Sequence, residues 1–297
     1  MTENKKIEII ESVTLMQGKA EGIRLSGKKI GLFPTLGFLH EGHLELIRQG
    51  RKHSDVLVMS LFVNPTQFGP NEDFDKYPRD IEGDIKKAQG EGVDIVFLPS
   101  PKEMYPDGFQ SSVKVEGITG FLCGKSRPGH FEGVTTVVAK LFNIIKPHFA
   151  LFGQKDFQQL AVIKKMVKDL NMDVDIVEVP TVREQDGLAM SSRNKYLNAG
   201  ERKSALCLKK SIDTALKMAG EGELRSEKII SSIRDLIISL PFTSIDYINI
   251  CDPETLEDVN ILKDKSLLAL AVKVGNTRLI DNCLIDLKDN KKTDSII

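Results

Sequence analysis

The chain has 297 residues, 41% of them hydrophobic, so it is long enough for two packed domains and is not disordered throughout. Its 41 basic and 42 acidic residues give a formal net charge of -1, which excludes an overall field that would hold nucleic acid or an anionic membrane. No run of 18 or more apolar residues occurs, and the four cysteines lie far apart without a CxxC pair. We expect a cytoplasmic protein with reduced thiols and neither a nucleic-acid nor a membrane partner.

Short apolar runs alternate with helical patterns through the first 180 residues. Runs that are apolar at consecutive positions predict strands covered on both faces, at 28–33, 55–63, 93–98, 148–152 and 174–179. Segments with apolar residues at helical spacing predict helices at 42–53, 79–90, 133–146 and 156–170. This order predicts an α/β fold: a Rossmann-like, doubly wound parallel sheet over residues 1–180.

A different pattern follows residue 192 and predicts a second, smaller α+β domain over residues 181–297, closing over the active site. Two amphipathic helices are predicted at 199–219 and 226–238, and alternating strands at 244–250, 266–274 and 277–285. The last two strands are separated only by Gly275 and Asn276, which is typical of a hairpin. Residues 286–297 are expected to form a solvated tail.

The segment FPTLGFLHEGH follows the strand predicted at 28–33 and leads into a helix. Ligands of open α/β folds bind at the carboxyl ends of the strands, so this position suits a nucleotide. Gly37 and Gly42 let the backbone approach a phosphate, and amides at a helix start attract anions. His40 and His43 could both stabilise charge on an α-phosphate and a departing pyrophosphate. This is the logic of the HxGH signature of adenylyl-transferring enzymes.

Two other interpretations of the paired histidines stay open. Zinc proteases place histidines four residues apart within a helix, as HExxH, whereas Gly42 interrupts a three-residue interval here. The histidines could also be incidental residues of a tight turn before a helix. The sequence identifies no metal ligands.

Two segments add polar side chains near strand ends. LFVNPTQF places Asn64 and Gln67 between phenylalanines, which suits a small polar acid with an apolar middle; a proline-containing loop with core phenylalanines is the alternative. GKSRPGHFEGV supplies Arg127 within a cluster of cations, which is either a phosphate contact or simply solvated.

A second strand-to-helix junction has the sequence FGQKDFQQL. Lys155 is placed to meet triphosphate oxygens, and Gln159 lies one helical turn further on. Gly153 permits a close turn, and Asp156 is typical of a helix cap. The alternative is that Lys155 is a solvated surface lysine.

The third cluster of donors lies in DGLAMSSRNKYL. Asp186 and Gly187 predict a turn, after which Ser191, Ser192 and Arg193 bring hydroxyl and guanidinium groups together. This pattern is typical of a loop that clamps phosphates and shelters an activated intermediate from water. An ordinary polar linker, with a serine or asparagine capping the next helix, is the alternative.

Taken in order, FPTLGFLHEGH, LFVNPTQF, SRPGHFEGV, FGQKDFQQL and DGLAMSSRN resemble the bacterial pantothenate synthetase (pantoate:β-alanine ligase) family, and the C-terminal LIDN segment extends the resemblance over nearly the whole chain. The resemblance implies an ATP site at Leu36, Gly37, Phe38, Leu39, His40, Glu41, Gly42, His43, Gly153, Gln154, Lys155, Asp156, Val182, Met190, Ser191, Ser192 and Arg193. It implies that Gln67 binds pantoate and β-alanine and that Gln159 binds pantoate. Asn64 and Arg127 are further candidates. His43 matches the family's proton donor and forms the catalytic set with His40 and Lys155.

The resemblance also implies an activity, cofactors and partners. The expected enzyme is an AMP-forming ligase of pantothenate biosynthesis that works through pantoyl adenylate, uses ATP with Mg²⁺, releases pyrophosphate and is a homodimer. Leu36 replaces the family's common methionine, a swap of similar size. Gln154 replaces a glutamate of many relatives, which puts a carboxylate role there in doubt.

Three rival functions stay open on the residues alone. A nucleotidyltransferase would leave the adenylyl group on its product, and a class I aminoacyl-tRNA synthetase would need a tRNA-binding surface that this composition does not suggest. A non-catalytic nucleotide sensor would need no second-substrate pocket, so Gln67 and Gln159 argue against it.

Overall fold

The computed structural model describes residues 6–70 and 72–290, which divide by their contacts into two compact units. Unit 1 comprises the described residues of Met1–Glu116 together with Ser126–Gln154 and Val162–Pro180. Unit 2 comprises Gly117–Lys125, Lys155–Ala161 and the described residues of Thr181–Ile297. Two short segments from the first 180 residues therefore belong to unit 2, and one of them carries Lys155.

The described part of unit 1 contains a six-stranded parallel sheet with the strand order β1-β4-β3-β2-β5-β6. Its strands are β1 (Glu8–Ile10), β2 (Ile30–Thr35), β3 (Val56–Leu61), β4 (Ile95–Phe97), β5 (Phe149–Gly153) and β6 (Asp175–Val179). Counted from β2, the order of the last five strands is 3-2-1-4-5, so the Rossmann-like prediction is confirmed. The direction of winding reverses between β2 and β5, the point at which such sheets bind ligands.

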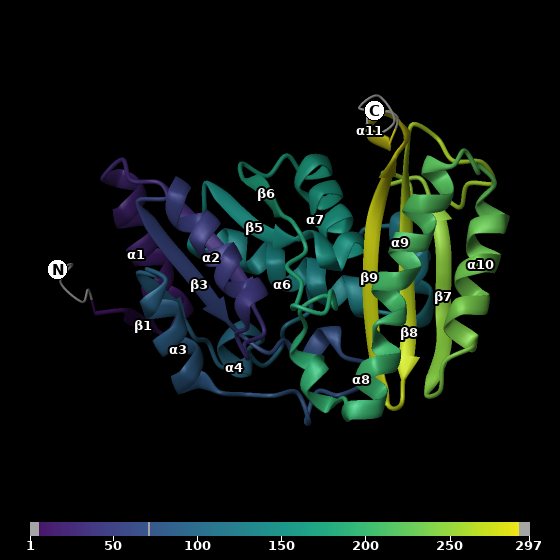
Figure 1. Ribbon diagram of the computed structural model, residues 1–297. Coiled ribbons are helices and arrows are strands. Elements are labelled where there is room, and N and C mark those ends of the chain that lie inside the picture. The colour runs from purple at the N-terminus through teal and green to yellow at the C-terminus, as the bar shows by residue number, and fades with distance from the viewer. Residues whose placement is uncertain (1–5, 71, 291–297) are drawn as a thin grey trace. The chain divides into compact units, whose positions relative to one another are not determined.

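Helices cover both faces of this sheet, with α2 and α3 in contact on one face and α1 and α6 in contact on the other (Figure 1). The helices are α1 (Val13–Leu25), α2 (Glu41–His53), α3 (Ile81–Gly90), α4 (Pro101–Met104), α6 (His130–Ile145) and α7 (Phe157–Asp169), of which α7 begins in unit 2. One turn, η1 (Pro65–Gln67), follows β3. The face under α2 is filled by a cluster that includes Phe33, Ile47, Met59 and Leu151.

The predicted helices and strands of this region are present, with shifts of at most three residues at their ends. The structure adds β1 and α1, which the sequence analysis missed. Helix α6 begins at His130, three residues earlier than expected, because Gly129 precedes it with φ +81° and turns the chain into the helix.

Unit 2 contains, in its described part, a three-stranded antiparallel sheet with the order β7-β8-β9. Its elements are η2 (Ile118–Gly120), α5 (Leu122–Ser126), η3 (Gln154–Asp156), η4 (Ser192–Tyr196), α8 (Ala199–Ala205), α9 (Cys207–Gly220), α10 (Ser226–Ile238), β7 (Thr243–Cys251), β8 (Lys265–Val274), β9 (Thr277–Asp286) and α11 (Leu287–Asn290). The last residue of α5, Ser126, and the first residue of η3, Gln154, belong to unit 1. The smaller α+β fold and its hairpin are confirmed, with Val274 paired to Thr277 across the two-residue turn. The helix predicted at 199–219 is divided at Leu206.

The expected solvated tail is wrong at its beginning, because Asp286 ends β9 and α11 follows it. The remainder, residues 291–297, lies outside the described residues. Within residues 6–70 and 72–290, no helix combines the length and the apolar character that a bilayer crossing requires. In the same residues the four cysteines are free thiols, and Cys123, Cys207 and Cys251 are buried.

Candidate active site

The histidine loop, Leu36–His43, joins the end of β2 to the start of α2 at the switch point of the sheet. Gly37 (φ +96°) and Phe38 (φ +56°) both have left-handed backbones, so the chain turns sharply before the helix. His40 is extended and is the N-cap residue of α2. The rings of His40 and His43 stack with their centroids 4.0 Å apart, which places both imidazoles at the amide-rich end of the helix.

A backbone hydrogen bond sets which nitrogen of His43 can donate. The amide of His40 donates to His43 Nδ1 at 3.3 Å, so this nitrogen is an acceptor. A neutral imidazole that accepts at Nδ1 carries its proton on Nε2. Nε2 is therefore the nitrogen through which His43 donates, and an N–H donor suits a phosphate oxygen or a leaving group that gains charge.

Two side chains of α3 hold the histidine loop by its main chain. The buried carboxylate of Asp84 accepts from the amides of Phe38 at 2.6 Å and Leu39 at 2.7 Å. One turn later, Lys87 Nζ donates to the carbonyl of Leu39 at 2.9 Å. Burial raises the pKa of Asp84, and the hydrogen bonds from the two amides oppose that shift. The residue before His40 is thus fixed at both its nitrogen and its oxygen.

Gln67 ends η1, beside the start of α6. The wholly buried Asn64 donates from Nδ2 to Gln67 Oε1 at 3.2 Å and to the carbonyl of Gly133 at 3.1 Å. Asn64 Oδ1 accepts from the hydroxyl of Tyr105 at 2.8 Å. Both the amino group and the oxygen of the Asn64 side chain are hydrogen-bonded within the protein. Asn64 therefore supports Gln67 and has no donor left over for a ligand. With its oxygen held, Gln67 can offer its Nε2 donors.

The backbone of Gln67 is held as well. Its carbonyl accepts from His130 Nδ1 at 2.8 Å and from Arg127 Nη2 at 3.3 Å. Arg127 also makes a two-point ion pair with Glu72, with an Nε to Oε1 distance of 2.7 Å. Burial raises the pKa of Glu72, but the hydrogen bonds and charge of Arg127 bring it below its usual value.

The start of α6 lies so close to η1 that position 133 must be glycine, since a Cβ there would lie 2.3 Å from the Thr66 carbonyl oxygen.

The Lys155 segment lies in η3, between β5 and α7. The side chain of Lys155 is 19% exposed, and its Nζ is 3.8 Å from Asp156 Oδ1. In α7, the buried Gln158 donates to the carbonyls of Ile118 at 2.9 Å and Phe121 at 2.7 Å. Gln159, the next residue, is only half-buried, so it remains accessible to a ligand.

Residues 182–190 fold into a tight hairpin. The amide of Met190 donates to the carbonyl of Val182 at 3.0 Å, and Gly187 turns the chain with φ +93° as the sequence predicted. The turn is followed by η4, whose first amides are capped by Ser191 Oγ through Arg193 N at 3.3 Å. Val182 and Met190 therefore lie side by side, directly before Ser191, Ser192 and Arg193.

The predicted site residues are divided between the units. Unit 1 contains the histidine loop, Gln67, Asn64, Arg127, Gly153 and Gln154. Unit 2 contains Lys155, Asp156, Gln159, Val182 and Met190–Arg193. The convergence of both groups on one triphosphate remains a prediction. An open parallel sheet that carries an HxGH loop at its switch point defines the class: nucleotide-binding α/β proteins of the adenylyl-transferring type.

Comparisons with known proteins narrow this class. The model of the Pantoate-beta-alanine ligase family matches residues 8–284. The pantothenate synthetase of Acetivibrio thermocellus is 57% identical over 95% of this chain and 100% of its own length, and that of Geobacter sulfurreducens is 56% identical over 94% and 99%. The crystal structure of the Thermus thermophilus enzyme has a TM-score of 0.89 at 41% identity, covering 94% of this chain and 100% of the other.

A Francisella tularensis pantoate-beta-alanine ligase, solved in complex with beta-gamma ATP and beta-alanine, has a TM-score of 0.76 at 35% identity and covers 94% of this chain and 98% of its own. The chain belongs to the pantoate-beta-alanine ligase family. It is an enzyme, a ligase that joins pantoate to β-alanine in pantothenate biosynthesis.

Sequence reasoning missed the residues that hold the site in place, chiefly Asp84, Lys87, Arg183, Asp281 and Asn282. A signal existed for two of them. Asp84 lies four residues before Ala88, on the face of α3 that is otherwise apolar, and Asp281 stands at an inward position between Leu279 and Ile285 of an alternating strand. A carboxylate on a buried face needs a donor, but its partner cannot be read from spacing.

Proposed function

We propose that the chain activates pantoate with ATP, forming pantoyl adenylate and pyrophosphate, and then transfers the pantoyl group to β-alanine with release of AMP. The observation that carries this proposal is the geometry of the histidine loop. Two stacked imidazoles stand at a helix N-terminus, and one of them, His43, accepts at Nδ1 and so donates through Nε2, on a main chain held by Asp84 and Lys87. Such preorganised donors stabilise charge that develops on a phosphate during transfer.

In unit 1, the histidine loop supplies the phosphate donors. Backbone groups of Leu36–Gly42 face the nucleotide, while His40 and His43 Nε2 share the charge of the α-phosphate and of the leaving pyrophosphate. Gln67 Nε2 binds the carboxylate of pantoate first and helps to orient β-alanine later. In this proposal Asn64 and Arg127 serve the site by holding Gln67, since their own polar groups are used within the protein.

In unit 2, the Lys155 segment and the hairpin supply the remaining contacts. Lys155, Ser191, Ser192 and Arg193 bind the β- and γ-phosphates. Val182 and Met190, paired across the hairpin, contact the adenosine together with Gly153, Gln154 and Asp156. Gln159 binds pantoate. Unit 2 closes over unit 1 when ATP binds and excludes water from the adenylate.

The chemistry balances in two displacements. A carboxylate oxygen of pantoate bonds to the α-phosphorus of ATP as the bond to the pyrophosphate oxygen breaks, with His43 Nε2 donating to the departing charge. The neutral amine of β-alanine then bonds to the acyl carbon, AMP leaves with the electron pair of the acyl–oxygen bond, and the nitrogen releases one proton to water. Direct condensation of the two ions is unfavourable in water, so the first step supplies the leaving group, and the protein supplies orientation.

For Mg²⁺ we name no protein ligands. No group of three or more His, Cys, Asp or Glu side chains suited to a metal ion exists within residues 6–70 and 72–290. Mg²⁺ typically keeps several waters and binds substrate phosphates, so it would arrive with ATP and neutralise triphosphate charge. We also propose a homodimer in the cytoplasm, on the strength of the family resemblance; the mass of the native protein by light scattering tests the first part.

Isotope exchange between pyrophosphate and ATP tests the proposed first step. Exchange should require pantoate and proceed without β-alanine, because the adenylate forms before the amine reacts. Exchange that required both small substrates would refute the stepwise route. Detection of free AMP as a product separates this function from a nucleotidyltransferase, which keeps the adenylyl group on its product, and turnover that depends on both substrates separates it from a nucleotide sensor.

A further inference from the structure

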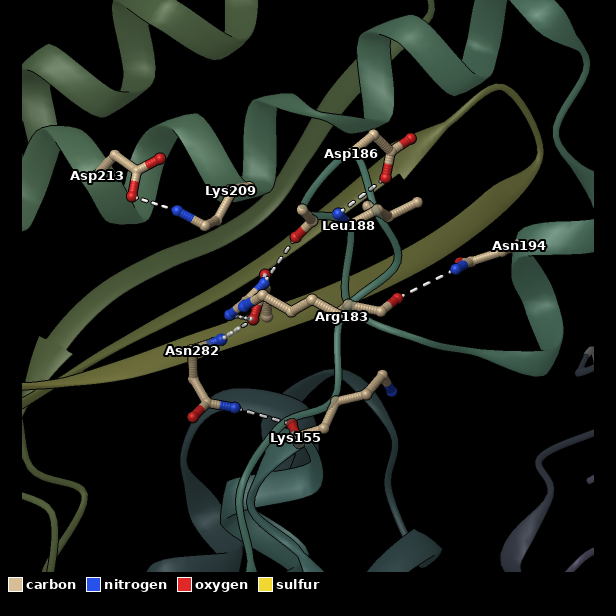
Figure 2. Close-up of polar contacts among 11 residues, drawn as sticks. Lys155, Arg183, Asp186, Leu188, Asn194, Lys209, Asp213 and Asn282 are labelled. Atoms are coloured by element: carbon tan, nitrogen blue, oxygen red, sulfur yellow. Dashed lines mark hydrogen bonds and ion pairs between the residues drawn. The ribbon is translucent and has the colours of Figure 1, made fainter. Parts of the chain in front are cut away.

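Two adjacent residues of β9, Asp281 and Asn282, contact two segments of unit 2: the hairpin that precedes Ser191–Arg193 and the Lys155 segment. Successive side chains of a strand point to opposite faces, so the two residues reach different neighbours. Figure 2 shows Asn282 directed at the main chain of Lys155, while Arg183 lies above it beside the same strand.

Asp281 holds the hairpin. Its buried carboxylate accepts from Arg183 Nη1 at 2.7 Å and from Nη2 at 3.0 Å. Nη1 of Arg183 also donates to the carbonyl of Gly187 at 3.1 Å, so one guanidinium connects the strand to the tip of the turn. A two-point pair of this kind fixes direction as well as distance.

Side-chain hydrogen bonds connect the hairpin to η4 and α8, so the hairpin also restrains η4. Asn194 Nδ2 donates to Glu184 Oε1 at 2.6 Å and to the carbonyl of Ala189 at 3.0 Å. Arg202 Nη2 of α8 donates to Glu184 Oε2 at 2.8 Å. Glu184 is the neighbour of Arg183, and Asn194 is the neighbour of Arg193. These hydrogen bonds therefore couple the position of Ser191–Arg193 to that of Asp281.

Asn282 holds the other segment. Its Nδ2 donates to the carbonyl of Lys155 at 2.8 Å, and in Figure 2 the ammonium of Lys155 points away from Asn282. The backbone amide of Asn282 donates to Asp281 Oδ1 at 2.9 Å, which ties the two residues to each other. A contact with the carbonyl fixes the backbone of Lys155 and leaves its charged end available.

We propose that Asp281 and Asn282 form a brace that sets the spacing between Lys155 and Ser191–Arg193 so that both meet one triphosphate. They are positioning residues: they touch no substrate and act through the residues that do. The inference rests on the proposed function in assigning those residues to phosphate. Donors must be placed to within a fraction of an ångström to stabilise a transferring phosphoryl group, and small displacements are costly.

The test compares Asn282→Ala with Asn249→Ala in the full chain. Asn249 lies on β7 of the same sheet and donates to Asp258 at the surface, so its loss controls for a missing asparagine in this sheet. Calorimetry measures the dissociation constant for ATP, and pyrophosphate exchange measures the first step. We expect Asn282→Ala to weaken ATP binding and to slow exchange by about tenfold, because the Lys155 contact shifts, whereas Asn249→Ala stays within about twofold of the wild type.

A second variant separates positioning from loss of structure. Asn282→Asp has the same shape but puts a carboxylate oxygen against the Lys155 carbonyl, so it should be worse than alanine at neutral pH. Its activity relative to the wild type should recover as the pH falls toward the carboxyl range, because the protonated acid donates again. Asn282→Ala should show no such recovery.

The outcomes are distinct. ATP binding by Asn282→Ala that equals the wild type, or a pH-independent ratio for Asn282→Asp, overturns the brace. A wild-type chain that binds ATP but fails to exchange pyrophosphate overturns the proposed function instead, while the ATP dissociation constants still decide the brace.

Discussion

The histidine loop of unit 1 and the hairpin of unit 2 are anchored in different ways. In unit 1, a carboxylate accepts from two main-chain amides of the histidine loop, so the anchor fixes the path of the backbone directly. In unit 2, the hairpin is held through the side chain of Arg183, whose guanidinium is separated from its own backbone by a flexible chain. The anchor of the histidine loop uses main-chain donors of the loop itself, whereas the anchor of the hairpin depends on one side-chain ion pair. Each anchor can therefore be removed separately by a single substitution.

The largest effect on stability should follow from breaking the anchor of unit 2. Arg183→Met leaves the carboxylate of Asp281, whose side chain is 0% exposed, without its cation. Removing one partner of a buried pair costs about 3–5 kcal/mol, because an uncompensated charge stays buried. Urea unfolding followed by circular dichroism measures this loss. Lys209→Met, which removes the exposed pair with Asp213, is the control and should cost about 0.5 kcal/mol or less. A loss equal to that of the control would show that the pair does not anchor the hairpin.

A smaller loss of stability but a larger loss of catalysis should follow from Asp84→Asn in unit 1. The amide can accept from only one of the two backbone donors and turns its own donor toward the other, which costs about 1–3 kcal/mol. The displaced loop should raise the KM for ATP and lower kcat by about a hundredfold, because His40 comes directly after Leu39 in the sequence and would be displaced with it. Steady-state kinetics at pH 7 provides the measurement. A normal kcat in a folded Asp84→Asn variant would show that Asp84 does not anchor the histidine loop for catalysis.

The same carboxylate gives an internal check through pH. Because the pKa of Asp84 is raised above its ordinary value of 3.8, protonation begins at a higher pH than for an exposed aspartate. Protonation removes an acceptor, so the affinity of the wild type for ATP should fall as the pH falls into that range. Asp84→Asn lacks the titrating group, so its affinity for ATP should not show this fall at low pH.

The smallest effect is expected for Lys87→Met, which removes one hydrogen bond to the carbonyl of Leu39 and leaves Asp84 in place. The cost should be about 0.5–1.5 kcal/mol, with a few-fold rise in the KM for ATP. Lys86→Met, the exposed neighbour on α3, is the matched control and should match the wild type in both measurements. Equal behaviour of the two variants would leave Asp84 as the anchor of the loop.

Much of the fold could be predicted because its strands are apolar at consecutive positions and its helices have regular spacing. The exceptions have physical reasons. β1 is a three-residue edge strand with two exposed positions, too short for a pattern, although α1 buries Met16, Ala20 and Ile23 at helical spacing and was open to detection. The break at Leu206 leaves the helical pattern intact across both helices, so spacing alone could not reveal it.

The candidate site was predictable only where its chemistry lies in one contiguous motif. His40 and His43 are three residues apart, and their position after a strand indicates an anion site. The residues that hold them come from elsewhere: Asp84 is 45 residues from Leu39, and Asp281 is 98 residues from Arg183. Pairings at such separations depend on the tertiary fold, which periodicity does not encode.

The contact between Asn282 and the Lys155 carbonyl has a consequence for synthesis. A chain leaves the ribosome from its N-terminus, and an early domain can fold while later residues are still being added. The sheet of unit 1 is complete once β6 has emerged, but Lys155 receives its partner only more than a hundred residues afterwards. A polypeptide interrupted before β9 would lack the contact to the Lys155 carbonyl, so under the proposed role of Lys155 we expect efficient use of ATP to begin only when the last strand is in place.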